Sequence, residues 1–202
     1  MTRKIALGFS ILLHPLLMPT TGIAIILFSG SYLSNFPPEA KKLLILLFTS
    51  GTLLLPLLMI PIFYMRGIIT DFQMLEKKQR IAPLTISLIF YLLTFFLFLR
   101  VPVYRFMHSF MLGSALLVFL TLLINNYWKI SIHMIGLGGL SSFLFVISVQ
   151  QNINLFPYLI LTTLASGIAG TSRLYLQVHT PAEVYSGYLL GGLVMMGCLA
   201  IF

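Results

Sequence analysis

The chain has 202 residues, of which 59% are hydrophobic and only 8% are charged, whereas about 25% of a typical soluble domain is charged. Twelve basic and four acidic residues are too few to cover a water-facing surface, so the composition excludes a soluble domain. The net charge of +8 does not indicate nucleic-acid binding, because the basic residues fall between apolar runs, where they face headgroups or hold an anion. The single cysteine, Cys198, excludes an intramolecular disulfide and a cysteine-based zinc site.

Seven apolar segments follow one another along the chain, and most are long enough to cross a bilayer. The first follows Arg3 and Lys4 but is too long for the apolar core of a signal peptide, so we expect a retained span. We therefore predict an all-α fold, a polytopic transmembrane helical bundle of six to seven spans, with residues 1–202 as a single membrane domain. The predicted segments are 5–28, 43–65, 84–99, 106–124, 131–149, 155–170 and 184–202.

Alternate crossings sort the predicted loops onto two sides of the membrane. The N-terminus and the loops at 66–83, 125–130 and 171–183 share one side, which carries eight of the twelve Lys and Arg residues. The positive-inside rule predicts that this side faces the cytoplasm. If several of these charges form a phosphate site, however, they are present for chemistry, so the orientation stays open.

The most informative pattern lies before the last segment. Ser172 and Arg173 stand at a membrane boundary, His179 follows the Arg by six residues, and Glu183 follows the His by four. A neutral imidazole can attack phosphorus, a carboxylate on its other ring nitrogen fixes the tautomer, and an Arg offers several donors to phosphoryl oxygens. The alternative is structural, because Thr180 and Glu183 also fit a capping box at the start of the last helix.

Two further polar segments fall on the same predicted side. Ser131 and His133 open the fifth segment, where free helix N–H groups favour an anion and His133 can protonate a leaving group. Lys77, Lys78 and Arg80 precede the third segment, and their structural alternative is a solvated boundary with basic side chains reaching to the headgroups. Topology permits all three segments to converge.

These segments resemble the motifs of the type 2 phosphatidic acid phosphatase family, which are Lys-x6-Arg-Pro, Pro-Ser-Gly-His and Ser-Arg-x5-His-x3-Asp. The third motif is matched most specifically, by Ser172, Arg173, His179 and Glu183, with Pro181, Gly187 and Gly191 in keeping. Residues 129–133 resemble the second motif, and Lys77, Lys78, Arg80 and Pro83 resemble the first loosely. The chain departs from the family at Glu183 in place of Asp, at Ile132 in place of Gly, and at Gln73 in place of the first-motif Lys.

The resemblance implies a helical phosphatase fold, with the motifs in residues 66–202, and a mechanism that uses no metal and no cofactor. His179 would form a phosphohistidine, Glu183 would orient His179, and His133 would protonate the leaving group. The implied substrate is a lipid phosphate or a polyprenyl diphosphate, in what we expect to be the cytoplasmic membrane of a bacterium. The implied phosphate-binding residues are Arg173, Arg80, Lys77 or Lys78, Ser131 and Ser172.

Two alternatives to a phosphatase remain open from the sequence. The departures in the first two motifs suit a catalytically silent relative that binds anionic lipid. Prolines inside the spans and His14 in the first segment suit a lipid transporter, although no internal repeat accompanies them. We expect His14 to serve packing or hydrogen bonding, and His108 to lie at the opposite membrane interface.

Overall fold

The computed structural model describes residues 2–71, 74 and 76–201, and these residues form helices joined by short connections. Two rods are composite: α1 (Arg3–Leu12), η1 (Pro15–Leu17) and α2 (Met18–Phe28) make the first, and α3 (Pro38–Thr49), the π-helical η3 (Ser50–Leu54) and α4 (Leu55–Met65) make the second. A short 3-10 turn, η2 (Tyr32–Ser34), connects them. The remaining rods are α5 (Lys77–Phe98), α6 (Arg105–Asn125), α7 (Ile132–Gln150), α8 (Phe156–Tyr175) and α9 (Pro181–Ala200).

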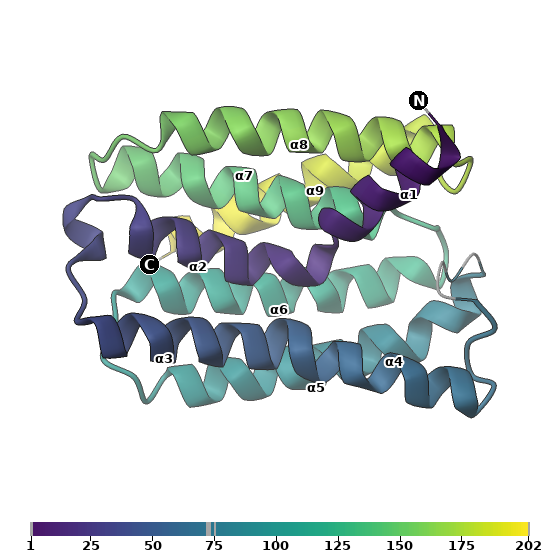
Figure 1. Cartoon of the computed structure of the whole chain (residues 1–202), viewed down its shortest axis with the longest axis horizontal. Helices are drawn as coiled ribbons and strands as arrows, with labels where there is room; N and C mark the ends of the chain where they lie inside the picture. The colour runs from purple at the N-terminus through teal and green to yellow at the C-terminus, as the bar shows by residue number, and fades with distance from the viewer. Residues whose placement is uncertain (1, 72–73, 75, 202) are drawn as a thin grey trace.

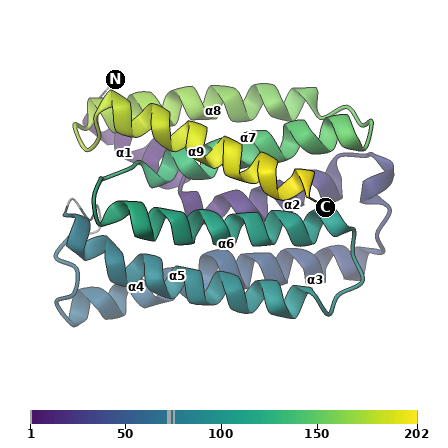
Figure 2. The same cartoon turned by 180° about the vertical axis from the view of Figure 1, so that it is seen from behind.

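Six of these rods are long and apolar enough to cross a membrane, which confirms the prediction of a helical integral membrane protein. The seventh rod, α8, is 20 residues long but is not among the six. The rods run side by side along the long axis of the molecule (Figures 1 and 2). Large apolar side chains such as Leu58, Phe96, Leu161 and Leu193 are exposed along them, as suits surfaces that face lipid.

The central helix of the bundle is α7, and it packs most extensively against α9. Small residues permit this approach, because a Cβ at Gly138 would collide with the main chain of Tyr188, and one at Gly191 with the main chain of Ile135. A main-chain hydrogen bond of 3.2 Å from Ser131 N to Glu183 O joins the starts of the two helices. This packing places the first turns of α7 and α9 side by side.

The first rod is broken rather than merely kinked. His14 is extended (φ −64°, ψ 135°) between α1 and η1, as expected for a residue before proline. Pro15 lacks an N–H and its ring opposes continuation of the helix. Nδ1 of His14 caps η1 by accepting a hydrogen bond of 3.3 Å from Leu16 N. The break therefore exposes a polar turn inside the first span, at a site that was predicted as one apolar segment.

Candidate active site

Four parts of the chain meet in one half of the bundle, which is the right-hand half in Figure 1. They are the break in the first rod, the start of α5, the connection from α6 to α7, and the connection from α8 to α9. A polar cavity of about 130 Å³ lies between them. Of the residues expected at the site, the structure brings Arg80, His133, Arg173 and His179 into its lining.

His179 lies in the connection before α9, and its ring is held on one side. Nδ1 lies 2.9 Å from Oε2 of Glu183 and 3.2 Å from the carbonyl oxygen of Lys129. Both partners are acceptors, so Nδ1 carries the hydrogen, and in the neutral ring the lone pair is on Nε2. The side chain is 1% exposed. The arrangement leaves Nε2 as the nucleophilic atom.

Glu183 both orients the His179 ring and caps the start of α9, two roles that the sequence presented as alternatives. Its Oε2 accepts hydrogen bonds from His179 Nδ1 and, at 3.1 Å, from Thr180 N, while the Thr180 hydroxyl accepts from Glu183 N at 3.4 Å. The capping box of α9 is therefore complete. Because the cap fixes the carboxylate relative to the helix start, it also fixes the orientation of the His179 ring.

The pKa of His179 is lowered from 6.5 to about 4, chiefly because burial disfavours the charged ring. The positive charges of Arg173 and Arg80 lower it further, and the hydrogen bond to Glu183 raises it only in part. The ring is therefore neutral at pH 7. The pair with Glu183 is a hydrogen bond between a neutral ring and a carboxylate, and the nucleophilic lone pair is available.

Two buried guanidinium groups line the cavity. Arg80, 4% exposed, donates from Nε to the carbonyl oxygen of Met74 at 2.9 Å and from Nη1 to that of Ile130 at 3.4 Å. Arg173, 7% exposed, donates from Nη1 to Oγ of Ser10 at 3.4 Å, and its buried Nε has no partner. Within the described part of the chain, no carboxylate lies within 4.0 Å of either group. Glu183 and Asp71 act on Arg80 only from a longer distance. Buried cations that form no close ion pair indicate an anion site.

The start of α7 adds two groups to this end of the bundle. Ser131 is fully buried, and its Oγ finds no hydrogen-bond partner among the described residues. Nε2 of His133 lies 3.0 Å from the carbonyl oxygen of Ser10, which only accepts, so Nε2 carries a hydrogen there. Nδ1 is therefore the ring nitrogen of His133 that remains for proton transfer.

Four of the expected phosphate ligands do not line the cavity, namely Ser131, described above, and Lys77, Lys78 and Ser172. Nζ of Lys77 bonds the carbonyl oxygens of Asn126 and Tyr127 at 3.4 and 3.1 Å. Lys78 is exposed and borders a hollow on the outer side of α5. Oγ of Ser172 donates to Ile168 O at 2.7 Å within its own helix. In the structure these side chains secure or border the site rather than face the cavity.

Sequence reasoning gave no site role to three residues that the structure places at the site. Ser10 and His14 reach it through the break in the first rod, and the available signal was His14 directly before Pro15 inside an apolar run. Lys129 lies with His179 and Glu183 around an outer hollow. Burial, followed by the positive charge of Arg80, lowers the pKa of the Lys129 ammonium group.

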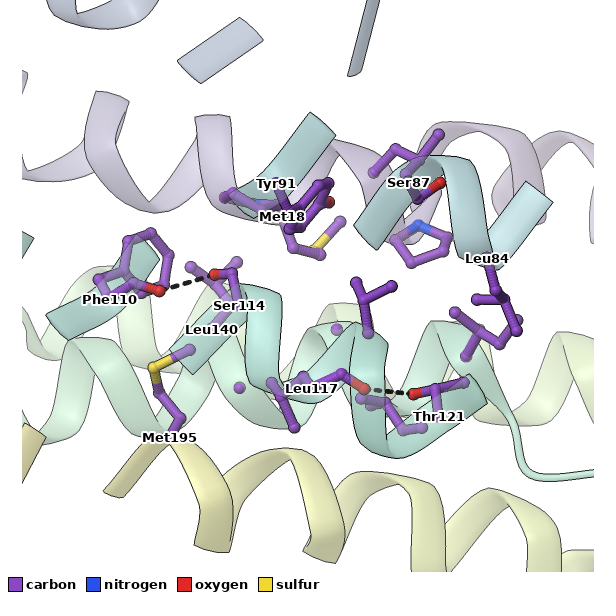
Figure 3. A pocket seen from close by; sticks show the side chains of 18 residues that line it. Met18, Leu84, Ser87, Tyr91, Phe110, Ser114, Leu117, Thr121, Leu140 and Met195 are labelled. Carbon is purple, nitrogen blue, oxygen red and sulfur yellow. Dashed lines mark hydrogen bonds between the residues drawn. The ribbon is translucent and has the colours of Figure 1, made fainter. Parts of the chain in front are cut away.

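An apolar cavity of about 70 Å³, whose lining is drawn in Figure 3, adjoins the polar one and is also lined by Phe110 and Ser114 of α6. The hydroxyls of Ser87, Ser114 and Thr121 line it, but each donates to the carbonyl four residues earlier in its own helix, at 2.7, 2.8 and 2.6 Å. The cavity therefore presents a mostly hydrocarbon surface, with Met18 and Met195 on facing sides. The residues shared by both cavities are Pro15, Leu16, Leu84, Ser87 and Ile132.

Comparison of the chain with protein-family models, with curated proteins and with solved structures found no match in any of the three. The described residues contain no group of three or more His, Cys, Asp or Glu side chains arranged to hold a metal ion.

Proposed function

We propose that this protein is a membrane-embedded phosphatase of the type 2 phosphatidic acid phosphatase family that hydrolyses a lipid phosphate or diphosphate in a bacterial cytoplasmic membrane. One observation carries the proposal: a neutral histidine, oriented by a carboxylate, borders a cavity that is also lined by two buried arginines, neither of which forms an ion pair with a described carboxylate. A nucleophile and an anion site in contact are what phosphoryl transfer through a phosphohistidine requires.

The geometry gives each group a task. Nε2 of His179 attacks phosphorus while Arg173 and Arg80 bind the phosphoryl oxygens and stabilise their charge. As the bond to the leaving oxygen breaks, its electron pair stays on that oxygen, and the protonated form of His133 supplies a proton from Nδ1. The hydrogen on Nε2 of His133 remains bonded to the Ser10 carbonyl oxygen. Water then attacks phosphorus and gives a proton to Nδ1 of His133, while the electron pair of the phosphorus–nitrogen bond returns to Nε2 of His179, which restores both histidines and releases phosphate.

The neighbouring cavity supports a lipid as the substrate. Because it shares five lining residues with the polar cavity, a molecule that places phosphate against Arg173 has an apolar space beside it. An apolar cavity of this kind stays dry and binds hydrocarbon rather than water. A substrate with a charged phosphate and a hydrocarbon chain suits both surfaces.

The test is phosphate release by the purified protein in detergent, from a panel of lipid monophosphates and diphosphates in the presence of a chelator. We expect turnover by the wild type and by His108→Ala, the matched control at the opposite end, where the ring bonds the Phe98 carbonyl oxygen at 3.1 Å. We expect no measurable turnover by His179→Ala. Equal turnover by His179→Ala would refute the proposal.

A second candidate is a catalytically silent relative that binds anionic lipid. The specific observation in its favour is that Lys77 and Lys78 lie outside the cavity, which leaves fewer cations around the phosphoryl group. It predicts that the folded wild type binds lipid phosphate and releases none on any substrate of the panel. The presence of an oriented His179 makes the phosphatase the preferred reading.

A further inference from the structure

The break in the first rod brings the His14 ring to the same cavity as Arg173 and His179. Nδ1 of His14 accepts the Leu16 N–H hydrogen, and an N–H group only donates. Nδ1 is therefore bare, the ring in this arrangement is neutral, and its hydrogen is on Nε2. No hydrogen bond between described residues occupies that Nε2.

His14 and His133, which both line the cavity, thus differ in the hydrogen-bonding group that they present to a ligand. The rings of His14 and His133 meet edge to face, with centroids 5.6 Å apart. His133 has its Nε2 hydrogen engaged with the Ser10 carbonyl oxygen, so its remaining nitrogen, Nδ1, only accepts while the ring is neutral, and in the protonated ring it serves the leaving group. His14 offers a donor, and a phosphoryl oxygen accepts hydrogen bonds.

The same break also holds Arg173. Oγ of Ser10 lies 3.4 Å from Nη1 of Arg173, and the carbonyl oxygen of Ser10 lies 3.0 Å from Nε2 of His133. The buried Nε of Arg173 remains without a partner, which independently points to an anion beside it. One turn of the first span therefore contacts two groups of the site and adds a donor of its own.

Resting on the proposed phosphatase function, we propose that His14 is a phosphate-binding residue, whose Nε2–H donates to a phosphoryl oxygen held by Arg173. The break at Pro15 places this donor at the cavity. The cavity volume of about 130 Å³ accommodates a phosphoryl group, since a water-sized group requires about 10–15 Å³.

The variants that test this role differ in the donor they retain. His14→Ala removes the ring, whereas His14→Gln keeps an N–H donor at a similar reach, on its side-chain amide. Binding of inorganic phosphate to the detergent-solubilised full chain is measured by calorimetry, with thermal unfolding of each variant. We expect His14→Ala to weaken phosphate binding by about ten- to a hundredfold, the effect of one hydrogen bond to a charged group. We expect His14→Gln and the control His108→Ala to bind nearly as the wild type does.

A second measurement needs no variant. In nitrogen-15 histidine NMR of the wild type, the Nε2 signal of His14 should shift on addition of phosphate. Unchanged phosphate binding by His14→Ala, binding by His14→Gln as weak as by His14→Ala, or a His14 signal insensitive to phosphate would overturn the inference.

The outcomes separate this inference from the proposed function. Phosphate binding that depends on His14, in a protein that hydrolyses no lipid phosphate, would support the phosphate-binding role of His14 and refute the proposed phosphatase function. Lipid phosphate turnover that depends on His179, together with phosphate binding that is unchanged in His14→Ala, would support the phosphatase function and refute the phosphate-binding role of His14.

Discussion

The two ends of the bundle hold similar residues in different surroundings. At one end, His179 bonds a main-chain carbonyl oxygen and lies near Arg80 and Arg173, which are buried. At the other end, His108 also bonds a main-chain carbonyl oxygen and borders a hollow with Arg105, but that arginine is exposed. An exposed cation is stabilised by water or headgroups, whereas a buried one needs an anion. The difference teaches that burial, rather than residue type, distinguishes the end of the bundle that we propose to be the active site.

The largest effect should come from removing a buried cation. Arg173→Gln should lower kcat/KM for lipid phosphate hydrolysis by about 10³-fold, because a donor aimed at the developing charge is lost. Arg105→Gln, at the opposite end, should change it by less than about twofold. Steady-state phosphate release from both variants makes the comparison, and similar losses at the two ends would remove the distinction between them.

Glu183→Gln separates the two jobs of that carboxylate. Glutamine also completes a capping box, so α9 should stay capped and the melting temperature should change little. The His179 ring loses its negative partner, however, and kcat should fall by about 10²-fold. The measurement is kcat beside thermal unfolding. A variant with normal activity would show that Glu183 serves only the helix start.

The protonation of His179 should set it apart from an ordinary histidine. Its folded-state pKa is lowered to about 4, while the unfolded value is 6.5, so the unfolded chain binds the proton more readily in that interval. Stability from this group is therefore complete above pH 6.5 and declines as the pH falls from 6.5 towards 4. A histidine NMR titration should show His179 still neutral at pH 5.5. Half-protonation near pH 6.5 would contradict the burial argument.

Thr180→Ala tests the contribution of the helix cap to stability and leaves both hydrogen-bond acceptors of His179 in place. Loss of the Thr180 hydroxyl leaves the Glu183 N–H without its side-chain acceptor, which should lower the free energy of unfolding by about 1 kcal/mol. Activity should persist, because the acceptors of His179 remain. Denaturation in a graded detergent mixture measures the stability, and phosphate release serves as the control.

The smallest effects are expected for the lysines outside the cavity. Lys78→Ala should change kcat/KM by less than about twofold, since Lys78 is exposed on the outer side of α5. Lys77→Ala should affect stability slightly through the loss of its bonds to the 126–127 carbonyl oxygens. Parallel assays of both variants measure this, and a loss as large as that of Arg173→Gln would place them in the phosphate site.

The helices could be predicted from the sequence because a membrane-spanning helix requires a long apolar run, which is recognisable without knowledge of tertiary contacts. It also placed His179, Arg173 and Arg80 on one side, since each is tied to a predicted boundary. It did not predict the orientation of Lys78, which on α5 lies about 200° around the helix from Arg80. Each residue of a helix turns by about 100°. Because the predicted start of α5 was uncertain by a few residues, the direction of the Lys78 side chain could not be predicted.

The first span was predicted, but its break at Pro15 was not, for a different reason. Pro15 inside an apolar run fits either a kink in a continuous helix or a break, and only the packing of neighbouring helices decides between them. The contacts of Ser10 with Arg173 and His133 join residues more than 120 positions apart. Such contacts depend on tertiary packing, which local patterns do not report.

The most direct test of the central claim is to trap the proposed phosphohistidine intermediate. Wild-type protein and the His179→Ala and His108→Ala variants are mixed briefly with lipid phosphate labelled with phosphorus-32 and then denatured in base, which preserves phosphohistidine. Label on the wild type and on His108→Ala, with none on His179→Ala, is the predicted result. Phosphate release by the wild type with label on no histidine, or label retained by His179→Ala, would contradict the assignment of His179 as the nucleophile.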